Sequence, residues 1–122
     1  MNILRNGSGI YTDYYQLTMA QGFFLTGRSE SLSCFDYFFR ENPFKGGYVI
    51  FAGLTDALEM IEDFSFNDEV LEYLRGLQFK EDFLQYLRSF KFRGTITSAR
   101  EGELVFPLEP FLRVEGTLIE AQ

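Results

Sequence analysis

The feature that most constrains this sequence is an uncharged, largely apolar stretch near its N-terminus. It runs from Tyr14 to Gly27 and follows directly on Thr12 and Asp13. Threonine is a residue type that caps helices, and Asp13 would then lie where the helix dipole favours a negative charge. Because Gly27 is a typical helix stop, the sequence predicts a helix that is capped by Thr12 and ends near Gly27.

The predicted helix has no charged face. Counting about 100° per residue from Leu17, one face carries Tyr14, Leu17, Ala20, Gln21 and Phe24. The opposite face carries Tyr15, Met19 and Phe23. A helix that is apolar all round is normally buried all round. We therefore expect the rest of its own domain to cover one face and a second body to cover the other.

Length and charge narrow the class of protein. A chain of 122 residues is enough for one domain with a modest core. The net charge of −7 argues against nucleic-acid binding, which needs clustered Lys and Arg to neutralise phosphates. The uncharged stretch is shorter than the roughly 20 apolar residues that cross a bilayer, and no secretory signal precedes it. We expect neither a nucleic acid nor a membrane as a partner.

Cysteine and histidine usage adds two expectations. Cys34 is the only cysteine, so it cannot form an internal disulfide. Its apolar neighbours predict a buried thiol, and a reducing compartment is the default for such a chain, so we expect a cytoplasmic location. The sequence contains no histidine, and histidine-based chemistry must therefore come from elsewhere.

Hydrophobic periodicity predicts helices mixed with short strands. Residues 31–40 alternate as a strand with two apolar faces, which indicates an interior strand. Residues 42–47 form a turn, and a short buried strand follows at 48–51. Helical spacing then predicts three helices, at 54–61, at 65–74 with a capping box opening at Ser65, and at 80–90.

The last thirty residues change to a pattern of short strands. Strands are predicted at 93–99, 103–106 and 111–115, which suggests a small curled sheet. Thr117 and Glu120 then form a capping-box pattern that opens a helix close to the final residue, Gln122. From this pattern we expect residues 1–122 to be a single N-terminal domain, truncated at the start of a further helix.

No complete catalytic constellation is visible. The sequence lacks a Walker or Rossmann glycine loop, a cluster with metal-ligand spacing, and a nucleophile beside a base. Residues 7–9 are interpreted as a flexible terminus. The turn at 42–47 is interpreted as a hairpin, although its N–H groups could approach a phosphate. Arg100, Glu101 and Arg113 are expected to form structural ion pairs or surface charges. We expect no catalytic and no metal-binding residue.

Three stretches, spread from one end of the chain to the other, carry a family resemblance. They read TDYYQLTMAQ at 12–21, FFRENPFKGGYVIFAGL at 38–54 and REGELVFPLEPFLRVEG at 100–116. In this order they resemble the N-terminal part of nicotinate phosphoribosyltransferase, an enzyme several times longer. Two positions depart from the family pattern: Leu108 stands where Asn is expected, and Thr117 where Pro is common.

The resemblance implies a fold and an activity. The fold is α+β, the α/β-hammerhead-like N-terminal domain of type II phosphoribosyltransferases, with a small, mostly antiparallel sheet and helices but without the α/β barrel. The full-length enzyme would be a homodimer that joins nicotinate to phosphoribosyl pyrophosphate with ATP hydrolysis, giving nicotinate mononucleotide in NAD salvage. Mg²⁺, the main phosphate site and the phosphorylated histidine would belong to the missing barrel, and ATP is expected for the full-length enzyme. This chain alone is therefore expected to bind no cofactor and to be inactive.

The resemblance also implies substrate-binding residues. A family tyrosine at the position of Tyr15 stacks on the pyridine ring of nicotinate in the active site of the other subunit, and Asp13 would help to shape that pocket. Arg40 would match an arginine that reaches phosphate groups across the dimer interface, through a guanidinium suited to phosphate oxygens. The alternatives are packing of Tyr15 inside its own domain and a strand-end charge in water for Arg40.

Two other functions stay open at this point. One is a non-catalytic interaction or dimerisation module, in which the aromatic helix docks on a partner without contacting a substrate. The other is a phosphoribosyltransferase specific for nicotinamide or quinolinate, since residues outside this chain would contact the pyridine substituent.

Overall fold

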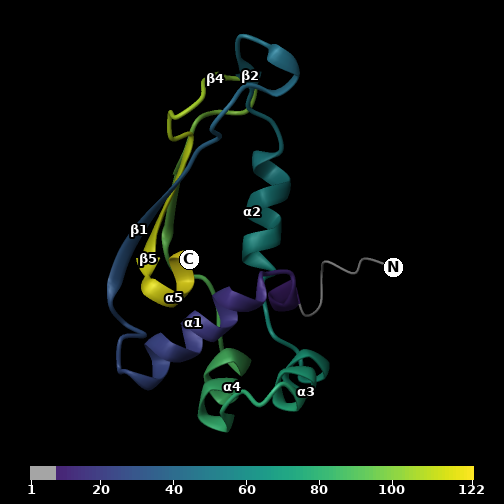
Figure 1. Ribbon diagram of the computed structural model, residues 1–122, viewed down its shortest axis with the longest axis vertical. Helices are drawn as coiled ribbons and strands as arrows, with labels where there is room; N and C mark the ends of the chain where they lie inside the picture. The colour runs from purple at the N-terminus through teal and green to yellow at the C-terminus, as the bar shows by residue number, and fades with distance from the viewer. Residues whose placement is uncertain (1–7) are drawn as a thin grey trace.

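The computed structural model describes residues 8–122 as short helices combined with two small antiparallel sheets (Figure 1). The elements are η1 (Ser8–Ile10), α1 (Tyr14–Leu25), β1 (Leu32–Tyr37), η2 (Pro43–Lys45), β2 (Val49–Ile50), α2 (Leu54–Glu62), α3 (Asp68–Gly76), α4 (Glu81–Arg88), β3 (Thr95–Ser98), β4 (Leu104–Val105), β5 (Leu112–Thr117) and α5 (Leu118–Ala121). One sheet has the order β1-β5-β3, and β2 pairs with β4 in the other. The described residues form no closed barrel. This arrangement confirms the α+β prediction.

The main core lies where α1, α3 and α4 meet, which we call the helical base. Its fully buried residues come from the apolar stripes of α3 and α4: Leu71, Leu74, Phe83, Leu84 and Leu87. On α1, Leu17 and Ala20 are buried against the same core. The ring of Phe24 adds a contact of 5.7 Å between centroids with Phe83. The stripes read from helical spacing are therefore the ones that build this core.

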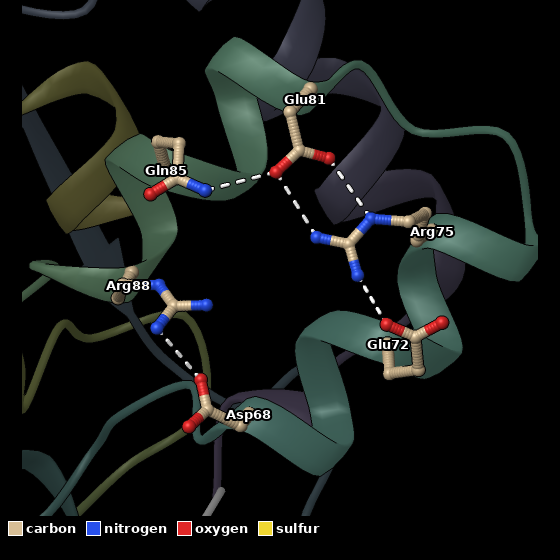
Figure 2. Close-up of polar contacts among 6 residues, drawn as sticks. All are labelled: Asp68, Glu72, Arg75, Glu81, Gln85 and Arg88. Atoms are coloured by element: carbon tan, nitrogen blue, oxygen red, sulfur yellow. Dashed lines mark hydrogen bonds and ion pairs between the residues drawn. The ribbon is translucent and has the colours of Figure 1, made fainter.

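Ion pairs on the solvent side tie α3 to α4 (Figure 2). The guanidinium of Arg75 donates to Glu81 from Nε at 2.9 Å and from Nη2 at 3.0 Å, and it also contacts Glu72. Arg88 pairs with Asp68 at 2.8 Å. The hydrogen bonds from Arg75 lower the pKa of Glu81 to about 2. The acidic residues of this region are thus exposed, but several of them pair across the two helices.

The strand at 31–40 was predicted to be interior, and that prediction is wrong. β1 ends at Tyr37 and forms one edge of the three-stranded sheet, where Leu32 pairs with Thr117 and Tyr37 with Leu112. No described element pairs with its other edge. The thiol of Cys34 is consequently exposed rather than buried. The short strand β2 is likewise less buried than expected, because Ile50 is 57% exposed.

An aromatic cluster joins the two sheets at the upper end of the molecule. The ring of Phe111 lies 5.2 Å from the rings of both Tyr37 and Phe51, and 6.1 Å from that of Phe39. The backbone N–H of Leu108 donates to the carbonyl of Phe39 at 2.8 Å. These contacts hold the β2–β4 ribbon to the end of β1.

The first described residues, Ser8 and Gly9, are held in place where a flexible terminus was expected. Gly7 lies outside the described residues. Ser8 is buried, and the N–H of Gly9 donates to the carbonyl of Ser65 at 2.9 Å. A Cβ at Gly9 would lie 2.5 Å from the ring of Phe66, so only glycine fits this approach. The interpretation of Ser8 and Gly9 as flexible is therefore wrong.

Candidate functional site

The candidate site is the start of α1. Asp13, not Thr12, is the N-cap residue, with extended backbone angles (φ −66°, ψ 143°). Because Asp13 holds the N-cap position, the prediction of a Thr12 cap is wrong. The carboxylate of Asp13 makes no capping hydrogen bond. The carboxylate therefore lies at the positive end of the helix dipole, and within residues 8–122 it has no hydrogen-bond partner.

Contacts with the helical base fix the inner side of α1. The ring of Tyr14 meets Phe79 edge to face at 5.9 Å, and the side chain of Gln21 accepts from the N–H of Lys80 at 2.7 Å. At the other side, the amide of Gln122 donates to the carbonyl of Gln16 at 3.0 Å. These contacts and the buried Leu17 set the rotation of α1 about its axis, and so decide which residues face outward.

Tyr15 lies on the outward side of α1. Its side chain is 56% exposed, and Met19, one turn further along, is 46% exposed. Within residues 8–122, no aromatic ring pairs with the ring of Tyr15. Packing of Tyr15 inside its own domain, the alternative considered from the sequence, is therefore not what the described residues show. A rigid aromatic ring is held on an ordered helix and is open to a partner.

Arg40 lies away from this pair. It follows the end of β1 by three residues and is exposed, and β1 runs from the helical base to the upper end of the molecule (Figure 1). Asp13 and Tyr15 begin α1, which belongs to the helical base. The structure thus brings Asp13 and Tyr15 to one helix end and puts Arg40 beyond the opposite end of the sheet. A single site within one copy of this chain cannot use all three.

Two of the charged residues expected to be structural have defined partners. Arg113 forms a two-point ion pair with Asp36 at 2.7 and 3.0 Å, and this hydrogen bonding lowers the pKa of Asp36 and raises that of Arg113. The carboxylate of Glu101 accepts from the N–H groups of Gly53 at 2.7 Å and Leu54 at 2.9 Å. Glu101 therefore caps α2 from a distant part of the sequence, which no local pattern could have indicated.

The described part of the chain contains neither a metal-binding cluster nor a helix of membrane-spanning length. Residues 8–122 contain no group of three or more Cys, His, Asp or Glu side chains placed to hold a metal ion. In the same residues, no helix has the length and apolar character needed to cross a bilayer. The exposed ring of Tyr15 and the carboxylate of Asp13 offer aromatic stacking and hydrogen-bond acceptance at the start of α1.

Comparisons with known proteins agree on one family. The family described as nicotinate phosphoribosyltransferase (NAPRTase) N-terminal domain matches residues 10–122. A nicotinate phosphoribosyltransferase of Bacillus subtilis is 47% identical over 114 residues, which cover 93% of this chain and 23% of the relative. One of Caenorhabditis elegans is 36% identical over 117 residues, covering 93% of this chain and 21% of the relative.

A solved structure agrees with the sequence matches. The crystal structure of human nicotinic acid phosphoribosyltransferase superposes with a TM-score of 0.79 at 34% identity, covering 88% of this chain and 22% of that chain. The fold is thus that of the N-terminal region of a phosphoribosyltransferase of this class. The chain belongs to the nicotinate phosphoribosyltransferase N-terminal domain family. It spans less than a quarter of the length of these relatives.

Proposed function

We propose that this chain is the N-terminal domain of a cytoplasmic, homodimeric nicotinate phosphoribosyltransferase, and that it supplies an aromatic platform to the active site of the opposite subunit. The full-length enzyme would join nicotinate to phosphoribosyl pyrophosphate with ATP hydrolysis, giving nicotinate mononucleotide for NAD salvage. The observation that carries the proposal is the exposed ring of Tyr15 on a helix whose opposite face is buried in the domain's own core.

The chemistry explains why such a platform is useful. Displacement at the ribose anomeric carbon requires the pyridine nitrogen to be held in line with the departing pyrophosphate. A tyrosine ring stacked on nicotinate fixes the plane of the pyridine, and stacking contributes roughly 0.5–1.5 kcal/mol beyond burial. The exposed part of the second face of α1, formed by Tyr15 and Met19, suits contact with another subunit.

Arg40 and Asp13 have supporting roles in this proposal. Arg40 is exposed at the far end of the sheet, where its guanidinium can pair with phosphate oxygens of a ligand held by the neighbouring subunit. Asp13 lines the pyridine pocket beside Tyr15. Mg²⁺ would neutralise charge on the leaving pyrophosphate, and the described residues offer no cluster to hold it. We therefore assign Mg²⁺ and ATP to the remainder of the enzyme and expect the 122 residues alone to be inactive.

The adjacent tyrosine provides a matched control for the test. Tyr14 and Tyr15 are almost equally exposed, at 57% and 56%, but the Tyr14 ring contacts Phe79 of its own domain. In a full-length enzyme that carries this domain, Tyr15→Ala should weaken nicotinate binding by about 1 kcal/mol or more. Tyr14→Ala should reduce stability and leave nicotinate affinity unchanged. Calorimetric titration with nicotinate measures the first effect and thermal unfolding the second.

The main competing function is a non-catalytic docking or dimerisation module. The exposed apolar side chains of α1 and β1, including Met19, Phe35 and Tyr37, favour this alternative. Sedimentation of the same variants separates the two functions. Loss of the dimer in Tyr15→Ala with normal nicotinate binding would support docking alone, whereas weaker nicotinate binding by an intact dimer supports the platform. Turnover of nicotinate by the isolated 122 residues would contradict the proposed division of the active site.

A further inference from the structure

A turn at the upper end of the molecule holds a large aromatic residue where the backbone favours asparagine. The N–H of Gly46 donates to the carbonyl of Pro43 at 3.0 Å, and both central residues of this turn, Phe44 and Lys45, have a φ of 56°. A turn with positive φ at both central residues is normally occupied by Asn-Gly. Phe44 is therefore strained, because a side chain in the left-handed region crowds the following carbonyl oxygen.

A second turn, from Phe106 to Glu109, shows the same conflict. The N–H of Glu109 donates to the carbonyl of Phe106 at 3.4 Å, Pro107 takes the second position, and Leu108 in the third has a φ of 63°. This is the order of a type II turn, whose third position requires a positive φ and is normally glycine or asparagine. A leucine is strained there for the same reason as Phe44.

Burial does not offset the strain in either turn. Phe44 is 100% exposed and Leu108 is 69% exposed. Gln78, which also has a positive φ (68°), differs from both because it directly follows the C-cap of α3. A left-handed residue commonly ends a helix at that position. The fold of the described residues thus explains Gln78 but not Phe44 or Leu108, and unexplained backbone strain is typical of functional sites.

The two turns flank Arg40. The carbonyl of Phe39 accepts from the N–H of Leu108 at 2.8 Å, and Arg40 is the next residue. The turn that carries Phe44 begins at Pro43, three residues further along the chain. Figure 1 shows β2 and β4, which adjoin the two turns, together at the upper end of the molecule. Two exposed apolar side chains therefore lie on either side of the exposed guanidinium of Arg40.

Charge makes this end suitable for contact with a second subunit. The whole chain has a net charge of −7, which opposes self-association over most of its surface. Residues 40–47 and 106–109 are neutral instead, because Arg40 and Lys45 balance Glu41 and Glu109. A neutral end meets a second subunit, which carries the same acidic domain, with less repulsion than an acidic surface would.

We propose that Phe44 and Leu108 are apolar anchors that seat this end of the domain, and with it Arg40, on the neighbouring subunit of the enzyme. This inference rests on the proposed function, from which it takes the homodimer and the reach of Arg40 to phosphate groups held by the neighbouring subunit. An aromatic ring buried in a pocket of a partner is the kind of side chain that dominates binding energy. Contact on both sides of Arg40 would fix the position of its guanidinium on the partner surface.

Relief of the strain separates this role from a purely structural one. Phe44→Asn combined with Lys45→Gly gives the first turn its favoured pair, and Leu108→Asn gives the second turn a favoured residue. In the isolated 122-residue chain, each change should raise the midpoint of thermal unfolding by about 2–4 °C, measured by circular dichroism. In a full-length enzyme that carries this domain, each should raise the subunit dissociation constant about tenfold or more, measured by sedimentation.

Kinetics test the link to Arg40. At enzyme concentrations that keep the dimer intact, the anchor variants should raise KM for phosphoribosyl pyrophosphate, as Arg40→Ala should, because the guanidinium is no longer held in place. Gln78→Asn is the matched control, since it changes a left-handed residue in the helical base. It should leave the dissociation constant and this KM within about twofold.

Three outcomes would overturn the anchor proposal. They are a thermal midpoint that does not rise on strain relief, a dissociation constant that both anchor variants leave unchanged, and an unchanged KM for phosphoribosyl pyrophosphate. None of them bears on the stacking role of Tyr15, which is measured through nicotinate affinity. Conversely, unchanged nicotinate affinity in Tyr15→Ala would reject the platform and leave the anchor result intact. A wild-type enzyme that sediments as a monomer would reject the homodimer and the anchors together.

Discussion

In the helical base, Phe83 and Leu84 have no exposure to solvent, whereas in the β2–β4 ribbon Ile50 and Leu104 remain 57% and 55% exposed. The two regions contain similar residue types. The base combines apolar residues of three helices, whereas each strand of the ribbon has only two residues. The comparison teaches that the base encloses its own core, while the upper end buries Phe51 and Val105 but leaves Ile50, Leu104 and Phe106 exposed.

The largest expected difference between the two regions is in stability. Phe83→Ala removes a fully buried ring and should lower the free energy of unfolding by about 3–5 kcal/mol. Ile50→Ala at the ribbon should change it by about 0.5 kcal/mol, as at other exposed positions. Urea unfolding of the isolated chain, followed by circular dichroism, measures both. Similar losses in the two variants would show that the ribbon is part of the same cooperative core.

A smaller and more local effect is expected at the cap of α2. Glu101→Ala leaves the N–H groups of Gly53 and Leu54 without their acceptor, and should destabilise α2 by about 1 kcal/mol. Hydrogen exchange should accelerate in α2 and stay constant in α3 and α4. Glu59→Ala, on the solvent side of α2, is the control and should leave exchange unchanged. Faster exchange in the helical base as well would mean that α2 is coupled to it.

The smallest effect concerns the ion pairs of the base and depends on pH. The pKa of Glu81 is lowered to about 2 by Arg75, so its carboxylate stabilises the folded state above its ordinary pKa of 4.5. This contribution is lost as the pH falls from 4.5 towards about 2. The free energies of unfolding of the wild type and of Glu81→Gln should therefore differ at pH 6 and become equal at low pH. A difference that persists at low pH would show that the carboxylate's charge is not involved.

Local patterns predicted α3 and α4 because each carries its own apolar stripe, and they predicted α1 because its stretch is uncharged and bounded by helix signals. The capping box of Thr117 and Glu120 is also confirmed, since both of its hydrogen bonds form within one turn. The cap of α3 was misplaced: Asn67, not Ser65, accepts from the N–H of Val70. Both residues are good caps, and the choice between them depends on where the chain leaves α2.

The features that local patterns missed depend on how distant segments of the chain pack together. The exposure of Cys34 follows from the edge position of β1, which alternation of side chains cannot reveal. The role of Glu101 depends on the return of a distant segment to α2. At the candidate site, the sequence indicated Tyr15 through its helical position and the family resemblance. The separation of Arg40 from Tyr15 by the length of β1 required the structure.

The pairing of β1 with β5 has a consequence for how the protein is made. Leu32 finds its partner only in Thr117, far along the sequence, and β3 also joins the sheet through β5. During translation, α1, α3 and α4 can therefore assemble on the ribosome while β1 still has no strand to pair with. An apolar strand that waits in this way is exposed to aggregation and to chaperones until β5 has been synthesised.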